Sequence, residues 1–238
     1  MTRLRPAFSA IAFAAAAALA APAATAPAPG RKASSAVVNW NRTVAATPEG
    51  GVRKGNPNAR VKVVEYASLT CPHCADFAKA SSGPLSSAVS SGKVSFEYRP
   101  YILNGIDAAA TVLARCASPA NFFRLVDSLF ATQAEWVEKV SGMSPAQKSQ
   151  LNALPENAVL IRIAEIGGML PLAARAEVPA ARAKACLADP ARLDRLGAIA
   201  EAAQALGVHG TPTFFINGRN VGSHDWSSLQ PLIRQAGG

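Results

Sequence analysis

The sequence predicts an α/β fold with a mostly helical insert, on three observations. A short β-branched segment, 61–67, runs directly into the motif Cys71-Pro72-His73-Cys74 and a helical stretch. A second strand-like segment, 94–100, follows that helix, and this order predicts a parallel β-α-β unit. No convincing strand then occurs in 105–189, before a second half with the pattern α-β-β-α.

The start of the chain has the pattern of a secretory signal peptide over residues 1–26. Arg3 and Arg5 precede an alanine-rich apolar run at 7–21, and small-residue cleavage sites follow. Residues 27–39 are rich in small residues and proline, so we expect a disordered segment there. The mature protein is therefore expected to be exported and soluble.

Charge and cysteine content narrow the classes of partner. The chain has 24 Lys and Arg against 15 Asp and Glu, dispersed without a basic block, which predicts no nucleic-acid partner. Four cysteines in an exported chain favour disulfides. The close spacing of Cys71 and Cys74 favours their pairing and leaves Cys116 with Cys186 as a structural disulfide, against the alternative of two buried free thiols.

The first strands and helix follow local signals. Residues 40–47 are a candidate edge strand, and turn signals bracket a short connection before residue 61. The helix after the cysteine motif spans about 72–90, with a kink expected at Pro84 because proline removes a backbone donor.

The segment after residue 189 also has clear local signals for its helices and strands. Asp189 and Pro190 open a helix whose expected buried stripe includes Leu196, Ile199 and Leu206. A hairpin at 213–222 and a last helix complete the chain. We expect residues 40–104 and 190–238 to form one domain and residues 105–189 an inserted helical domain.

The CxxC motif carries chemistry because of its place at a helix start. Unpaired N–H groups there favour a thiolate, which makes Cys71 the attacking thiol and Cys74 its partner one turn later. His73 can stabilise that thiolate by charge or hydrogen bonding. The alternatives are a static disulfide and a zinc site, but the sequence offers no further ligand pattern, so we expect no metal.

Glu65 lies inside the apolar strand at 61–67, where an unpaired carboxylate is costly. We expect it to be a buried proton acceptor for Cys74. The alternative is that strand alternation turns Glu65 toward solvent.

Four features together resemble the DsbA-like branch of the thioredoxin fold. They are the CPHC motif at 71–74, the pattern Val64-Glu65-Tyr66-x-Ser68, the segment Gly210-Thr211-Pro212-Thr213-Phe214 and the position of the helical insert. The resemblance implies a thioredoxin fold with an inserted helical domain, a cis peptide bond before Pro212, and substrate binding by Pro72, Thr211 and Pro212. It also implies dithiol chemistry without a cofactor.

This resemblance predicts a periplasmic thiol:disulfide oxidoreductase that introduces disulfides into reduced exported proteins. A quinone-linked membrane thiol oxidoreductase is the expected redox partner. Thr211 keeps an isomerase or reductase as an alternative, because threonine is frequent there in isomerases, and a non-catalytic peptide-binding chaperone is a further one. Residues 31–60 are too short for the dimerisation domain of periplasmic isomerases, and we expect a monomer.

Overall fold

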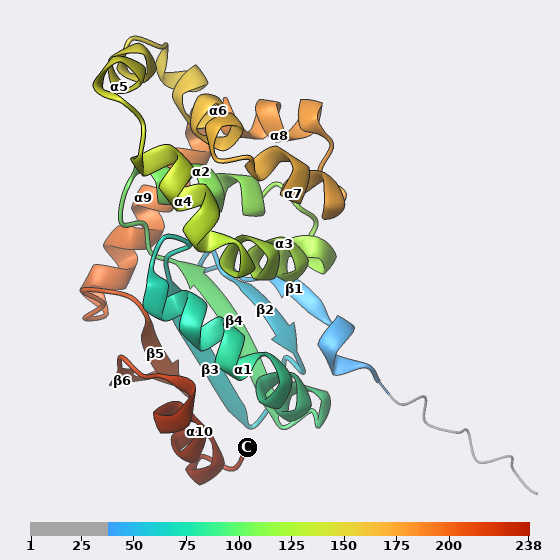
Figure 1. Ribbon diagram of the computed structural model, residues 1–238. Coiled ribbons are helices and arrows are strands. Elements are labelled where there is room, and N and C mark those ends of the chain that lie inside the picture. The colour runs from blue at the N-terminus through green and yellow to red at the C-terminus, as the bar shows by residue number, and fades with distance from the viewer. Residues whose placement is uncertain (1–37) are drawn as a thin grey trace, which may run out of the picture. The chain divides into compact units, whose positions relative to one another are not determined.

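The computed structural model describes residues 38–238 (Figure 1). The expected signal peptide and nearly all of the expected disordered segment lie outside these residues. The described part is built on a six-stranded sheet in the order β1-β2-β4-β3-β5-β6. Its strands are β1 (Val44–Ala46), β2 (Val52–Gly55), β3 (Val61–Ala67), β4 (Val94–Pro100), β5 (Thr213–Ile216) and β6 (Arg219–Gly222).

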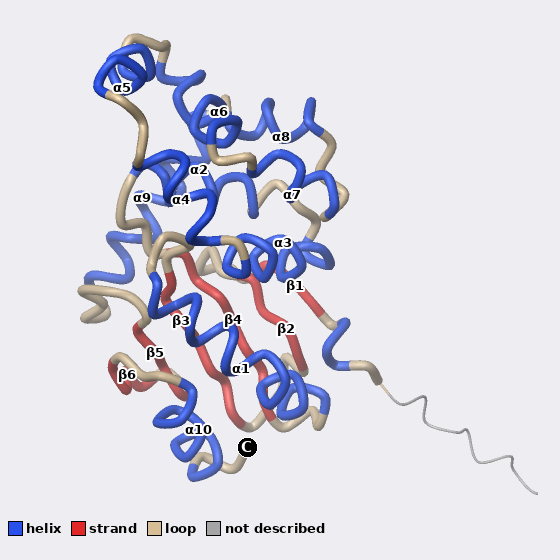
Figure 2. The backbone as a smooth tube through the Cα atoms, viewed as in Figure 1, coloured by secondary structure: helices blue, strands red, loops and turns tan. Residues whose placement is uncertain are grey.

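The helices fall into a framework set and an inserted set, which gathers near one end of the sheet (Figure 2). The framework helices are α1 (Pro72–Ser90), α9 (Pro190–Ala205) and α10 (Trp226–Gln235). The inserted helices are α2 (Gly105–Ala114), α3 (Pro119–Ala131), α4 (Gln133–Ser141), α5 (Pro145–Asn152), α6 (Glu156–Ile166), α7 (Met169–Arg175) and α8 (Ala180–Leu187).

Strand β3 is central because it pairs with β4 in parallel and with β5 in antiparallel register. Its side chains alternate between the two faces of the sheet. Val61 and Val63 join the core that contains Phe77 of α1. Tyr66 faces the other way and forms a smaller core with residues of α9, including Ala203. By this alternation Glu65 belongs to the α1 side of β3.

The hydrophobic core continues from the sheet into the insert, since buried residues of both belong to one cluster. Cys116 and Cys186 form a disulfide between the chain just after α2 and helix α8, with their Cα atoms 6.1 Å apart and 70 positions between them in the sequence. This is the pairing that the cysteine spacing predicts. Within residues 38–238 no single helix is long and apolar enough to span a membrane, although the bent pair α6 and α7 meets both criteria together.

Several sequence expectations need correction. The connection before β3 contains strand β2, whose Arg53 and Lys54 hide any apolar pattern; its pairing with β4 makes it a strand. The expected edge strand at 40–47 is present as β1 at the edge of the sheet but is shorter, because a 3-10 turn, Trp40–Arg42, takes up its first residues. Helix α9 ends at Ala205, so Leu206 leaves the expected buried stripe and is 52% exposed.

Candidate active site

The two cysteines of the CxxC motif lie where β3 passes into α1. Cys71 is the N-cap of α1, and Pro72 is its first residue, a position that suits proline because no N–H is needed there. Both thiols are free and buried, and Cys71 keeps 5% of its surface exposed. The motif therefore presents one slightly accessible sulfur at a helix N-terminus and a second sulfur behind it.

The inserted helices hold the backbone around Cys71. The Asp107 carboxylate of α2 accepts hydrogen bonds from the N–H of Leu69 at 2.9 Å and of Leu103 at 3.0 Å. At the start of α4, the Gln133 amide donates to the carbonyls of Leu69 at 2.8 Å and Cys71 at 2.9 Å. The insert thus fixes the chain on the approach to the CxxC motif.

The loop before β5 lies against the same sulfur. The Thr211–Pro212 peptide bond is cis, and the Cys71 thiol donates to the Thr211 carbonyl at 3.3 Å. Thr213, the next residue but one, pairs with Tyr66 of β3. The antiparallel β3–β5 pair therefore places the backbone of Thr211 beside the CxxC motif, where the resemblance expects a substrate-binding loop.

The surroundings of the two thiols give them opposite acidities. The hydrogen bond from the Cys74 thiol is the main cause that lowers the pKa of Cys71 to about 5; the Thr211 hydroxyl and the N–H groups of Cys74 and His73 add to it, against burial. Burial raises the pKa of Cys74 far above its ordinary value, and its hydrogen bond to Cys71 adds to that rise. Cys71 is therefore a thiolate at neutral pH, and Cys74 keeps its proton.

His73 stabilises this thiolate through its backbone N–H. Its side chain is exposed and lines a surface groove with Pro212, His224 and Trp226. The sequence predicts stabilisation by charge or hydrogen bonding; the helix start provides a hydrogen bond through the backbone, and a role for the imidazole charge stays a prediction.

Glu65 is buried on the same face of the sheet as α1, with 3% of its surface exposed. The solvent-facing alternative is thus wrong. The pKa of its carboxyl is raised to about 8, mainly by burial and also by the neighbouring Cys71, while Lys54 opposes both. Its Oε1 has no hydrogen-bond partner among the described residues. The expected role as proton acceptor for Cys74 stays a prediction.

Three polar residues near the site were missed by sequence reasoning. Asp107 had a sequence signal, because it is the one acid in an alanine-rich apolar helix. The structure buries it completely. Gln133 and Lys54 had none, since both reach the site only through the tertiary fold. Within residues 38–238 no group of His, Cys, Asp and Glu side chains is arranged to hold a metal ion.

Fold and site together define a thioredoxin-like protein with a DsbA-like helical insert. A family model described as thioredoxin matches residues 47–235, most of the chain, and the chain belongs to this family.

Among curated proteins, the chain is similar to two provisionally named protein-disulfide oxidoreductases, of Rickettsia bellii and Rickettsia conorii. Each is 29% identical over 76% of this chain, and the matches span 62% and 58% of those relatives. The chain thus covers less than two thirds of the length of these relatives.

Solved structures give a closer match in length. The crystal structure of a protein-disulfide isomerase from Novosphingobium aromaticivorans is 30% identical, with a TM-score of 0.71, over 78% of this chain and 97% of that one. The crystal structure of Wolbachia pipientis alpha-DsbA1, 22% identical with a TM-score of 0.58 over 77% and 89% of the two chains, shows the same fold.

Proposed function

We propose that this protein is a thiol:disulfide oxidoreductase that exchanges a Cys71–Cys74 disulfide with the dithiols of exported proteins. The observation that carries the proposal is the opposed acidity of two hydrogen-bonded thiols at a helix start. Disulfide exchange needs an accessible low-pKa thiol that leaves and attacks easily, together with a second thiol within reach. Cys71 and Cys74 meet these requirements.

The proposed reaction begins with the oxidised protein. A client thiolate attacks the Cys71 sulfur, the Cys71–Cys74 bond breaks, and Cys74 leaves as a thiolate. Because its pKa is raised, Cys74 takes up a proton, and Glu65 is the neighbouring acid that can supply it.

A second client thiolate then attacks the client sulfur of the mixed disulfide. The Cys71–client bond breaks, and Cys71 leaves as the stable thiolate. The client has lost two electrons to form a disulfide, and the protein has gained them as a dithiol. On reoxidation the steps reverse, and Glu65 takes the proton from Cys74 as it attacks.

The low pKa of Cys71 supports the oxidase direction, because a stable thiolate stabilises the reduced form and makes the disulfide easier to reduce. An isomerase is the second candidate. Thr211 and the Novosphingobium protein-disulfide isomerase at 30% identity favour it.

We further propose that the protein works in the periplasm as a monomer and is reoxidised by a quinone-linked membrane thiol oxidoreductase. The signal-peptide pattern of residues 1–26 supports export, and an oxidase needs an electron acceptor to turn over. Cell fractionation, with and without residues 1–26, tests the location.

The decisive test is incubation of the oxidised protein with a reduced dithiol peptide. We expect one peptide disulfide per protein, and none with Cys71→Ser. The redox equilibrium against glutathione separates the two candidates: a potential near that of thioredoxin would exclude the oxidase. Rescue of scrambled ribonuclease would support the isomerase, and peptide binding that survives Cys71→Ser without any exchange would support a chaperone.

A further inference from the structure

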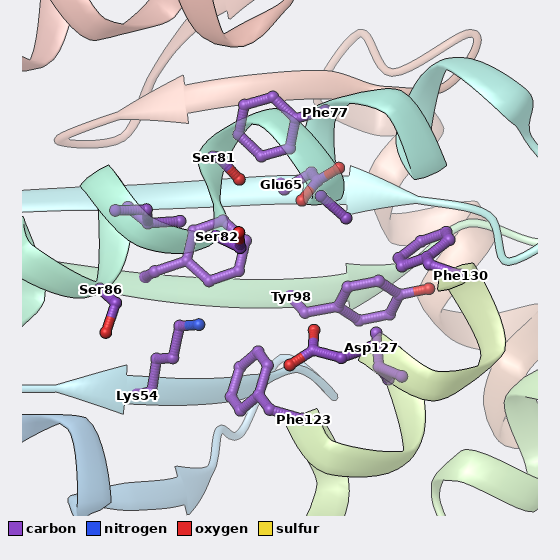
Figure 3. A pocket seen from close by; sticks show the side chains of 14 residues that line it. Lys54, Glu65, Phe77, Ser81, Ser82, Ser86, Tyr98, Phe123, Asp127 and Phe130 are labelled. Atoms are coloured by element: carbon purple, nitrogen blue, oxygen red, sulfur yellow. The ribbon is translucent and has the colours of Figure 1, made fainter. Parts of the chain in front are cut away.

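A cavity of about 180 Å³ lies beneath the active-site helix, between α1, α3 and strands β2 to β4 (Figure 3). Glu65 enters it from β3, and the unpartnered Oε1 belongs to this side chain. The cavity is polar as well as aromatic, since it is also lined by Lys54, Asp127 and three serines. A space of this size with several polar groups suits ordered water.

Lys54 reaches the cavity from β2. Its ammonium group lies over the rings of Phe96 at 5.4 Å and Phe123 at 4.7 Å, which stabilise a cation in a half-buried position. Burial lowers the pKa of Lys54, while Asp127 and Glu65 raise it. The charge of Lys54 therefore acts on both carboxylates of the cavity.

Asp127 lies at the mouth of the cavity, on helix α3 of the insert. It is exposed to solvent, although it lines the cavity. A larger outer groove of about 690 Å³ lies between α1 and the α3–α4 region and begins at Pro72. The cavity and the outer groove share the lining residues Ala78, Ser82, Asp127 and Phe130. The wall between the buried space and the surface thus contains an ionisable carboxylate.

The proposed function requires such a passage. Each half-reaction moves one proton between Cys74 and Glu65, and Glu65 must then exchange it with solvent before the next cycle. With 3% exposure and α1 lying over it, Glu65 has little direct access to bulk water.

We infer that Asp127 and Lys54 form the proton outlet of this active site. Asp127 exchanges the proton of Glu65 with solvent through water in the cavity. Lys54 is a positioning residue whose charge keeps Glu65 able to release its proton. The inserted domain thereby contributes a side chain to the chemistry. This inference rests on the proposed thiol exchange.

The ionisable groups that face Glu65 define the pH dependence to be measured. They are Cys71 at the N-cap of α1, Cys74 within α1, Lys54 from β2, Tyr98 from β4 and Asp127 from α3. The pKa of Tyr98 is raised well above its ordinary value by burial, so it stays neutral in the working range. Glu65 and Asp127 are then the carboxylates available to pass the proton on.

The test follows the reaction of the reduced protein with Ellman's reagent, an aromatic disulfide. Each protein molecule that becomes oxidised releases two coloured thiolates, one after the other. The first release comes from attack by Cys71 and depends on reagent concentration. The second comes from attack by Cys74 on the mixed disulfide, is independent of that concentration, and requires the Cys74 proton to leave through Glu65. The variants are Asp127→Asn and Lys54→Met, with Asp194→Asn on exposed α9 as control.

We expect Asp127→Asn to leave the first release unchanged and to slow the second about tenfold, less than the loss of a direct acid–base group costs. Small buffer acids should restore the rate of the second release in Asp127→Asn. Lys54→Met should shift the pH midpoint of the second release upward, because the charge that opposes the raised pKa of Glu65 is lost. In a Glu65→Gln background, Asp127→Asn should add nothing.

A second release at the wild-type rate in both Asp127→Asn and Lys54→Met would overturn the proposed outlet. Equal slowing by the control Asp194→Asn would overturn it as well, and so would further slowing when Asp127→Asn is added to Glu65→Gln. Loss of the first release in the wild type would instead overturn the proposed function.

Discussion

The sulfur of Cys71 lies 3.3 Å from the carbonyl oxygen of Thr211, a residue 140 positions further along the chain. As a thiol, Cys71 donates a hydrogen bond to this carbonyl. As a thiolate it has no proton to donate, and the carbonyl becomes free to accept an N–H from a client strand. We therefore propose that the ionisation that activates Cys71 also prepares the neighbouring backbone for a substrate.

The hydroxyl of Thr211 should tune the acidity of Cys71. It is buried without a partner in the dithiol form, and it is one of the groups that lower the pKa of Cys71. We expect Thr211→Val to raise that pKa by about one unit, the size of one hydrogen bond to a charged group. Thiolate absorbance against pH measures the shift.

Thr213→Val is the matched control, because its hydroxyl donates to the Gly210 carbonyl at 2.8 Å. It should leave the Cys71 titration in place. An unchanged pKa in Thr211→Val, or an equal change in both variants, would contradict the assignment.

The acidity of Cys71 also predicts a pH profile for its reactivity. Alkylation of the reduced protein by iodoacetamide should modify Cys71 alone, with a midpoint at about pH 5, because only the thiolate reacts. Cys74→Ala removes the hydrogen bond that lowers this pKa most and should move the midpoint upward. Modification of Cys74 first, or a midpoint at the ordinary cysteine value, would refute the opposed acidities.

Much of this framework is predictable from the sequence because its signals are local. The β-branched run at 61–67 and the Asn217–Gly218 hairpin turn appear at the expected bounds. The strand alternation that buries Tyr66 against α9 also turns Glu65 toward α1, which is why an acid in an apolar strand was informative. Helix α1 follows from Pro72 at its first turn, and it continues through Pro84.

Other parts of the site were unpredictable because they depend on contacts between distant segments. Gln133 bonds to the Cys71 carbonyl across 62 positions, and Asp107 bonds to Leu69 across 38. Lys54 is brought to the cavity by β2, which is a strand because it pairs with β1 and β4. A polar residue in a short segment gives no indication of the cavity that the fold will build around it.

Burial of Glu65 should make stability depend on pH. In the folded protein its carboxyl holds a proton up to about pH 8, whereas in the unfolded chain it loses the proton near pH 4.5. The folded state therefore binds more protons in this window, and stability falls as pH rises through it. Glu65→Gln has no carboxyl to ionise, so its free energy of unfolding should not fall in this way. The difference between the variant and the wild type should grow from pH 4.5 to 8 and then level off, at a few kcal/mol as an upper limit.

Urea unfolding of the reduced proteins at several pH values measures this difference. Glu138→Gln, on an exposed position of α4, is the control and should give a difference that does not vary with pH. A flat difference for Glu65→Gln as well would show that Glu65 ionises normally in the folded protein.

The Cys116–Cys186 disulfide should act on stability and leave the active site unaffected. It closes a loop of 70 positions, so its loss should cost about 4 kcal/mol by the loop-closure entropy of the unfolded chain. The cysteines are 1% and 7% exposed, and mild reduction that opens Cys71–Cys74 should leave this bond intact. Mass spectrometry after stepwise reduction and alkylation follows both pairs, and loss of both together would count against a structural role.

Cys116→Ala and the double variant with Cys186→Ala should lose similar stability, because either change removes the same cross-link, while both keep the low pKa of Cys71. A changed Cys71 titration in these variants would instead mean that the disulfide sets the geometry of the active site through the insert, whose Gln133 and Asp107 hold the chain before α1.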